Sequence, residues 1–293
     1  MRRAAVVATV FTASFAAVFG AIFSASCTTL APLHAPDCRI ITEAQTDHRL
    51  LRSRSVELHT ARYTVHKTFP VLDAGIPSAP VINTRVEEAI RAAERDFLQA
   101  AAQAAQLELH APWDFVVTWT LSEFTPQRFS ALLEIYAYTG GAHGSTTLVP
   151  INVDIPSGTE ILLSDLWKTS QGGVAAEPKT HAEPNAHAEP NARAESDWAG
   201  WNEWLRALSE TARPLLAAEL KRTSGASPDA DWLEEGTLPA AANFRIFTLK
   251  GDTLIFRFAQ YQVAPYSSGM PEITIPLEAV RQLARSRKTG APQ

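Results

Sequence analysis

The strongest constraint on the fold is the order in which strand-like and helix-like periodicities follow one another along the chain. Strand-like alternation between residues 56 and 65 is followed by an amphipathic helical segment, and alternation then returns in several later segments. Alternation places every second side chain on one face of a sheet, whereas apolar residues three or four positions apart form one face of a helix. This order predicts an α+β fold in which helices pack on one face of antiparallel sheets.

The first predicted helix extends from a capping residue, Asn83 or Thr84, to about Leu107. A short polar side chain at a helix start accepts hydrogen bonds from free backbone N–H groups. The apolar positions of this helix recur at helical spacing and form one stripe: Val86, Ile90, Phe97 and Ala101. Strands are expected after it at residues 115–119, 130–138 and 147–153. The pattern therefore predicts a helix that packs on a sheet.

The C-terminal part of the chain repeats this combination. An amphipathic helix is expected near residues 198–215. Two of its three tryptophans share a stripe with leucines, which favours core packing over a sugar-binding platform: Trp198, Trp201 and Trp204. Strands are expected on both sides of Lys250-Gly251-Asp252, a hairpin signal, and a basic helix follows. We therefore expect two intimately associated subdomains, at residues 56–125 and 126–287.

A low-complexity segment interrupts the second subdomain. AEPKTH, AEPNAH and AEPNAR follow one another as three hexads from residue 176 to residue 193. Proline at every sixth position prevents long helices and ladders, and the hexads offer almost no apolar surface to bury. We expect a disordered insert at residues 170–196. His181 and His187 lie in it, and we do not expect such a segment to hold a metal ion.

The N-terminus has the composition of an export signal. Two arginines precede an uncharged apolar run that ends near Phe23, and small residues follow. We expect residues 1–26 to be a signal peptide and residues 27–55 to be a tether. Cys27 is the expected lipidation site, which predicts an extracytoplasmic lipoprotein anchored to a membrane at the periplasm or cell surface.

Three alternatives for this segment stay open. The signal peptide can be cleaved after Ser26 without lipidation, so that the domain is simply secreted. Cys27 can pair with Cys38 in a disulfide, because the chain would be in an oxidising compartment. The apolar run is also almost long enough to remain as an uncleaved membrane anchor.

Charge and motifs restrict the function classes. The formal net charge is −5, and it becomes −7 without residues 1–26, which contain two arginines and no acids. Nucleic acid is therefore not an expected partner, because its binding requires a clustered basic face. Two cysteines are too few for a disulfide framework or a cysteine zinc site. The sequence contains no G-x-S-x-G, H-E-x-x-H or P-loop motif, so we expect no metal, no cofactor and a binding protein rather than an enzyme.

One loop stands out as a candidate site. The sequence YTGGAHGST places Gly140 and Gly141 just before His143, between two predicted strands. Glycine permits backbone conformations that a Cβ atom would forbid, and it allows close approach of the chain. We interpret His143 as a histidine whose hydrogen bonds hold the loop, with catalysis as the alternative.

These segments resemble a known bacterial architecture. ARYTVHKTFPVLDAGIPSAPVINTRVEEAI is similar to a PdaC-type N-terminal domain. YAYTGGAHGSTTLVPINVDIPSGTEILLSDLW and FRFAQYQVAPYSSGMPEITIPLEAV resemble an RsiV-type C-terminal domain. In the anti-sigma protein of the latter type, this region binds lysozyme. PdaC-type domains accompany a separate peptidoglycan deacetylase domain.

The resemblance implies an exported, non-catalytic cell-envelope protein that recognises a lysozyme-like protein or peptidoglycan. The chain departs from both relatives. Only three residues precede its apolar segment, so we expect no portion that binds a sigma factor, and the His/Asp metal set of a deacetylase is absent. The alternative function is a peptidoglycan-modifying hydrolase or deacetylase that uses His143.

Two loops are expected to form one ligand-binding surface, because each of them follows a predicted strand. Tyrosine side chains supply rigid amphipathic contact area at protein interfaces. The expected ligand-binding residues are Tyr136, Tyr138, Gly140, Gly141, His143, Tyr261 and Tyr266. The prediction requires His143 and Tyr266 to lie at the same end of the domain.

Overall fold

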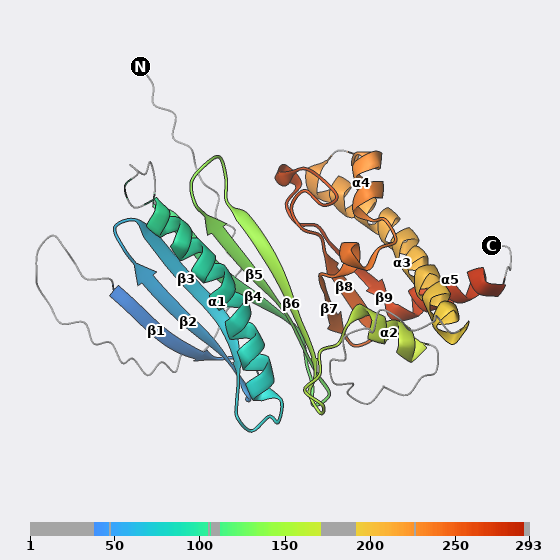
Figure 1. The fold of residues 1–293 in the computed structure, drawn as a ribbon, viewed down its shortest axis with the longest axis horizontal. Helices are drawn as coiled ribbons and strands as arrows, with labels where there is room; N and C mark the ends of the chain where they lie inside the picture. The colour runs from blue at the N-terminus through green and yellow to red at the C-terminus, as the bar shows by residue number, and fades with distance from the viewer. Residues whose placement is uncertain are drawn as a thin grey trace, which may run out of the picture. The chain divides into compact units, whose positions relative to one another are not determined.

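The predicted α+β class is confirmed. In the computed structural model, the residues whose structure is described are 38–46, 48–104, 106, 112–170, 192–225 and 227–289. They form a six-stranded sheet and a three-stranded sheet with helices, as Figure 1 shows. The predicted signal peptide, the lipidation site Cys27 and most of the hexad insert lie outside the described residues. Among the described residues, no helix has both the length and the apolarity that crossing a membrane requires.

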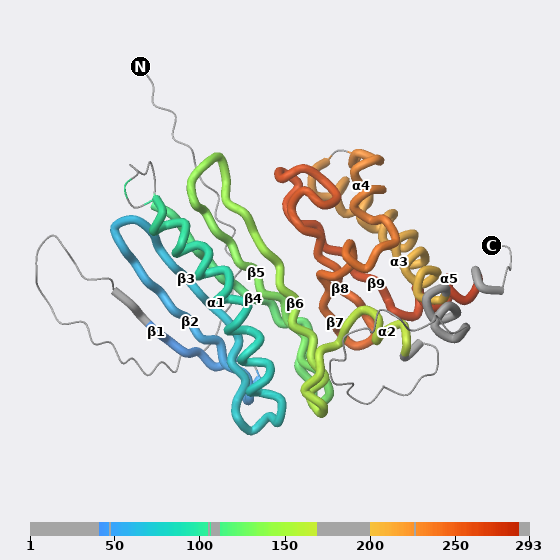
Figure 2. Tube along the Cα trace, in the orientation of Figure 1, coloured from blue at the N-terminus to red at the C-terminus, as the bar shows by residue number. Residues whose placement is uncertain are grey.

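The six strands of the larger sheet lie in their sequence order. They are β1 (Cys38–Gln45), β2 (Leu51–His59), β3 (Tyr63–Leu72), β4 (Trp113–Phe124), β5 (Arg128–Tyr138) and β6 (Ser145–Asp154). Neighbouring strands are antiparallel except β3 and β4, which are parallel. The chain leaves β3, passes through α1 (Ala79–Gln103) and returns in the same direction as β4, a path that Figure 2 traces.

Helix α1 covers one face of this sheet. Val86, Ile90 and Phe97 are buried against strand residues such as Phe115, as the apolar stripe predicted. The helix begins at Ala79 rather than after Asn83. The Asn83 side chain instead accepts a hydrogen bond from the Leu72 backbone N–H (2.9 Å) and donates one to the Leu72 carbonyl (3.0 Å). Asn83 therefore fixes the helix to β3 and does not cap it.

The predicted tether at residues 27–55 is wrong from Cys38 onwards. β1 and the first part of β2 lie in that range, and β1 pairs with β2 along its whole length. Their sequences are rich in polar residues because this edge of the sheet is largely exposed. Charged pairs connect the two strands: Arg54 Nε donates to Glu43 at 2.8 Å, and Arg52 lies 3.3 Å from the same carboxylate.

The predicted subdomain boundary at residue 125 also needs correction. β4 and β5 pair from Asp114–Tyr138 to Phe124–Phe129, so the segment between them is only a hairpin turn. One apolar core includes residues from Leu51 to Ile155, and a second begins at Leu163. The change from one core to the other therefore lies between residues 155 and 163. Thr125-Pro126 resembles a boundary because turns and linkers use the same residue types.

The second core is built on the smaller sheet. Strands β7 (Phe247–Lys250), β8 (Thr253–Arg257) and β9 (Glu272–Pro276) are antiparallel. The remaining helical segments are α2 (Leu163–Ser170), α3 (Ala192–Ser224), α4 (Ala230–Gly236), η1 (Ala241–Phe244), η2 (Tyr266–Ser268) and α5 (Leu277–Thr289). Residues 192–196 of the predicted disordered insert belong to α3, and that helix continues past Pro214. Trp201, on the predicted stripe, is partly buried against this core, and Trp204, which the stripe did not include, is fully buried and stacks on it; the side chain of Trp198 lies outside the described residues.

A buried polar network joins the two sheets. Ser130 on β5 donates to the Asn152 side chain on β6 at 2.6 Å. Asn152 Nδ2 then donates to the Phe247 carbonyl of β7 (2.8 Å), and the Leu249 N–H donates to the Ser130 hydroxyl (2.7 Å). These backbone groups lie on the free edge of β7. Side chains of the larger sheet thus satisfy an edge that would otherwise be buried without partners.

Candidate ligand-binding site

The connection between β5 and β6 supplies the first part of the site. Gly140 and Gly141 both have φ of 92°, in the left-handed region that favours glycine. Tyr138 donates from its hydroxyl to the Gly141 carbonyl at 3.2 Å. This glycine turn brings His143 to an exposed position at the end of the hairpin.

The second part is the segment that precedes β9. Tyr261 has φ of 65°, a left-handed conformation that is unfavourable for a residue with a side chain. Its carbonyl accepts a hydrogen bond from Trp232 Nε1 of α4 at 2.9 Å, which helps to hold this backbone in place. Non-glycine residues in such conformations occur preferentially at functional sites. Tyr261 is 51% exposed, so the strained residue presents its ring to solvent.

The two segments meet in what we call the tyrosine–histidine cluster, formed by His143, Tyr261 and Tyr266. The imidazole of His143 stacks on the Tyr266 ring, with centroids 3.9 Å apart and planes 20° apart. His143 Nε2 lies 3.1 Å from the Tyr261 hydroxyl, and the two tyrosine rings are 5.8 Å apart. The predicted proximity of the two loops is confirmed.

Hydrogen bonds assign the tautomer of His143. Nδ1 lies 3.0 Å from the Gly144 carbonyl, which can only accept, so Nδ1 carries the proton. In the neutral imidazole Nε2 is then an acceptor, and the Tyr261 hydroxyl donates to it. Both ring nitrogens are therefore engaged. Among the described residues, no carboxylate forms a hydrogen bond or ion pair with this imidazole.

Tyr136 lies directly below the loop. A Cβ atom at Gly144 would stand 2.4 Å from its ring, so the backbone packs closely against the phenol end of this side chain. Burial raises the pKa of the Tyr136 phenol, and the nearby Tyr266 and Asp114 raise it further because they disfavour a second negative charge. Tyr136 therefore stays neutral through physiological pH.

Sequence reasoning missed two residues that position the cluster, Gln260 and Trp232, and one acidic neighbour of Tyr136, Asp114. Gln260 Oε1 accepts a hydrogen bond from the Thr146 backbone N–H at 3.2 Å and thereby joins the two segments. Trp232 fixes the Tyr261 backbone, and Asp114 lies near Tyr136. Only Gln260 had a local signal, because it directly precedes Tyr261. The other two depend on strand register and helix packing.

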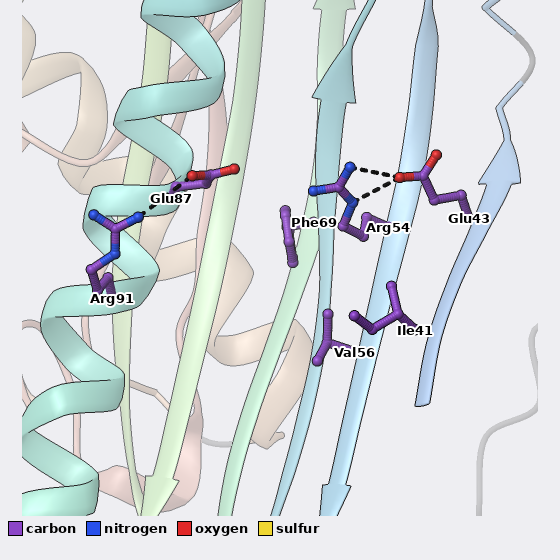
Figure 3. A pocket seen from close by; sticks show the side chains of 7 residues that line it. All are labelled: Ile41, Glu43, Arg54, Val56, Phe69, Glu87 and Arg91. Carbon is purple, nitrogen blue, oxygen red and sulfur yellow. Dashed lines mark hydrogen bonds and ion pairs between the residues drawn. The ribbon is translucent and has the colours of Figure 1, made fainter. Parts of the chain in front are cut away.

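A groove on the helix-covered side of the sheet is separate from this cluster. Its volume is about 420 Å³, and residues of α1 and β1–β3 line it. Figure 3 shows Arg54 directed at Glu43 and Arg91 directed at Glu87. Because each arginine already has a carboxylate partner, the groove offers no uncompensated charge to a ligand.

Comparison with known proteins identifies two family matches. Residues 58–146 match the family described as deacetylase PdaC, and residues 202–278 match a family described as a protein of unknown function, DUF3298. The chain is 23% identical over 171 residues to the peptidoglycan-N-acetylmuramic acid deacetylase PdaC of Bacillus subtilis. That match covers 58% of this chain but only 29% of the deacetylase.

Solved structures of DUF3298 proteins are also similar. A family member from Pseudomonas aeruginosa aligns with a TM-score of 0.45 and 18% identity, over 84% of this chain and 92% of that one. A member from Bacteroides fragilis aligns with a TM-score of 0.38 and 15% identity, over 83% and 90%. The family matches therefore show that residues 58–146 are similar to a PdaC-type domain and that residues 202–278 are similar to a DUF3298 domain.

Proposed function

We propose that this protein is an extracytoplasmic binding protein of the cell envelope whose ligand contacts the tyrosine–histidine cluster. The PdaC-like domain supports an envelope location, because the related deacetylase is named for its action on peptidoglycan. Membrane attachment through lipidated Cys27 is part of the proposal. Mass spectrometry of the mature N-terminus tests whether Cys27 carries lipid. An unmodified Cys27 would refute the lipid anchor.

The observation that carries the proposal is the stacked, solvent-exposed aromatic surface itself. His143 and Tyr266 stack face to face, and Tyr261 is held exposed by an unfavourable backbone conformation. A surface ordered in this way loses little side-chain entropy when a ligand binds. Aromatic residues of this kind supply much of the energy at binding surfaces.

Peptidoglycan is the first ligand that we propose. Co-sedimentation of the protein with purified cell-wall material tests this, using the wild type and the double variant Tyr261→Ala/Tyr266→Ala. We expect the double variant to bind at least about tenfold more weakly, as loss of two aromatic anchors implies. Leu162→Ala is the matched control, because Leu162 is similarly exposed (50%) and follows a residue that bonds to Asn152, near the end of β6 that is remote from His143. Equal binding by all three proteins would refute a role for the cluster.

A lysozyme-like protein is the second candidate ligand. The RsiV-type resemblance of the C-terminal segments suggests it, and the net charge of −5 favours the approach of a basic protein. Calorimetry with lysozyme at two salt concentrations tests this directly. We expect binding that weakens with salt and is lost in Tyr261→Ala/Tyr266→Ala. If no heat of binding is detected at either salt concentration, lysozyme is not a ligand.

A hydrolase or deacetylase that uses His143 is the alternative function. The hydrogen bonds of the imidazole favour binding, because Nε2 already accepts from Tyr261 and Nδ1 donates to Gly144. Release of acetate or of reducing ends from peptidoglycan would measure either activity. Turnover in the wild type that disappears in His143→Ala would overturn the non-catalytic proposal.

A further inference from the structure

Three potential metal ligands come together on the face of the six-stranded sheet that is opposite α1. We call it the open face; β7 packs against it at β4, β5 and β6, whereas the three ligands lie on β2 and β3. Glu57 and His59 are two residues apart on β2, so both side chains lie on the same face. The register of β2 and β3 pairs Glu57 with His66, which places the second imidazole beside them. Two strands thus supply two nitrogen ligands and one carboxylate.

The distances suit one metal ion after small side-chain rotations. One ligand atom from each residue lies within 4.8 Å of the other two. His59 Nε2 is 3.7 Å from the Glu57 carboxylate, and the two imidazoles meet edge to face with centroids 5.0 Å apart. Ligands at about 2.0–2.2 Å from a tetrahedral zinc ion are about 3.3 Å apart. His59 and Glu57 are therefore near their liganded distance without any metal.

The site is open to solvent, and the sheet holds its ligands in place. The side chains of Glu57 and His59 are each 46% exposed, so an ion can enter from solvent. Their backbones belong to paired strands in the interior of the sheet, which restricts movement of the ligands relative to one another. Next to them on β3, Thr64 donates to Asp114 at 2.5 Å, so this neighbouring carboxylate already has a partner.

We propose that Glu57, His59 and His66 bind one divalent transition-metal ion, with zinc as the reference ion. Two imidazoles and a carboxylate are the ligand types of three-residue zinc sites, in which further coordination positions remain for water or another ligand. Calcium and magnesium are disfavoured, because both ions prefer oxygen ligands. The proposal does not depend on the tyrosine–histidine cluster.

Zinc titration of the full chain by calorimetry tests the proposal. We compare the wild type with His59→Ala/His66→Ala and with Glu57→Gln, which keeps the shape of the side chain and removes its charge. We expect the double variant to lose one equivalent of zinc, and Glu57→Gln to bind about tenfold or more weakly. His48→Ala is the matched control, because this histidine packs edge-on against Phe124 and lies outside the ligand set.

A spectroscopic readout separates this site from histidines elsewhere in the chain. Cobalt(II) substituted for zinc gives d–d absorption bands that report its ligands, and we expect these bands to change in Glu57→Gln but not in His48→Ala. Circular dichroism in a chelator shows whether each variant is folded. If the double variant does not fold, Glu57→Gln decides. The proposal would be overturned if the folded variants bound zinc with the stoichiometry, affinity and cobalt bands of the wild type. It would also be overturned if the wild type bound no zinc.

Discussion

The buried network between the two sheets should contribute a large share of the stability of the protein. Asn152 is only 4% exposed and Ser130 is fully buried, and together they satisfy two backbone groups on the free edge of β7. The perturbation that tests this is Asn152→Ala. It removes the acceptor of the Ser130 hydroxyl and the donor to the Phe247 carbonyl in one step.

The size of the effect follows from the groups left without partners. A buried polar group without a hydrogen bond costs about 1–3 kcal/mol, and two such groups remain. The Ser130 hydroxyl still accepts from the Leu249 N–H, which moderates the loss. We therefore expect Asn152→Ala to lower the free energy of unfolding by roughly 2–5 kcal/mol, against a usual total of about 5–15 kcal/mol.

Equilibrium urea unfolding, followed by tryptophan fluorescence and circular dichroism, measures this loss. Asn243→Ala is the matched control, because Asn243 donates to the Leu238 carbonyl at an exposed position. We expect it to change the free energy of unfolding by only about 0.5 kcal/mol, as is usual for surface substitutions. In addition, Ser130→Ala and Asn152→Ala should be non-additive by about 0.5–3 kcal/mol, since they share one network. A loss below about 1 kcal/mol for Asn152→Ala would refute the reasoning.

Three further predictions concern close packing and ionisation. Gly236→Ala should lower the free energy of unfolding by about 3 kcal/mol or more, because its Cβ would stand 2.0 Å from the Gln262 carbonyl oxygen; exposed Gly75→Ala is the control. Gly144→Ala should lower the free energy of unfolding by about 1–3 kcal/mol, because the new methyl group would meet the Tyr136 ring. The loss should be smaller when Tyr136 is also replaced by alanine, and equal losses in urea unfolding would contradict this. Because the Tyr136 pKa is raised above its ordinary value of 10.0, its share of stability is present below pH 10.0 and is lost as the pH rises through the raised pKa. Ultraviolet difference spectra measure the ionisation of Tyr136, and alkaline unfolding of the wild type is compared with that of Tyr136→Phe. An equal loss of stability at high pH in both proteins would count against this prediction.

The elements that the sequence predicted well are those whose apolar residues recur at one period. The apolar stripe of α1 and the alternating Val149, Ile151 and Val153 of β6 pack into the same core, so periodicity alone locates them. The hairpin of β7 and β8 followed from Lys250-Gly251-Asp252, and Gly251 has the positive φ that such a turn requires. These features are local, and the sequence encodes them within a few residues.

The features that the sequence did not reveal depend on partners that are distant in the chain. β1 looked like a tether because an edge strand can remain polar, and its pairing with β2 carries no hydrophobic signal. The first turn of α1 was missed because Asn83 bonds to Leu72 instead of capping the helix. The proximity of the two site loops was predicted, but the stacking of His143 on Tyr266 and the strained Tyr261 required the structure. The Glu57–His59–His66 group depends on the register of β2 with β3, which no spacing rule supplies.

The strand register places the proposed metal position and Tyr136, which lies against the loop that carries His143, on the same face of the six-stranded sheet. Across the open face, the register aligns Glu57 with His66, Val116 and Tyr136 on successive strands. Neighbouring strands are about 4.8 Å apart, so His66 and Tyr136 are separated by about 10 Å. Tyr136 lies against Gly144, next to His143, so only an extended ligand of at least this length can contact a bound metal ion and the cluster together.

Thermodynamic linkage tests whether the two positions act on the same ligand. If one glycan contacts both, zinc must change the affinity for the glycan, and the glycan must change the affinity for zinc by the same factor. We expect zinc to tighten the binding of soluble peptidoglycan fragments about fivefold or more, within the usual range of coupling between sites. Glu57→Gln should remove this enhancement while the zinc-free affinity stays the same. Equal affinities for peptidoglycan fragments with and without zinc would mean that the two positions are independent sites. A ligand that contacts the metal ion and the cluster together must bind with an affinity that depends on zinc.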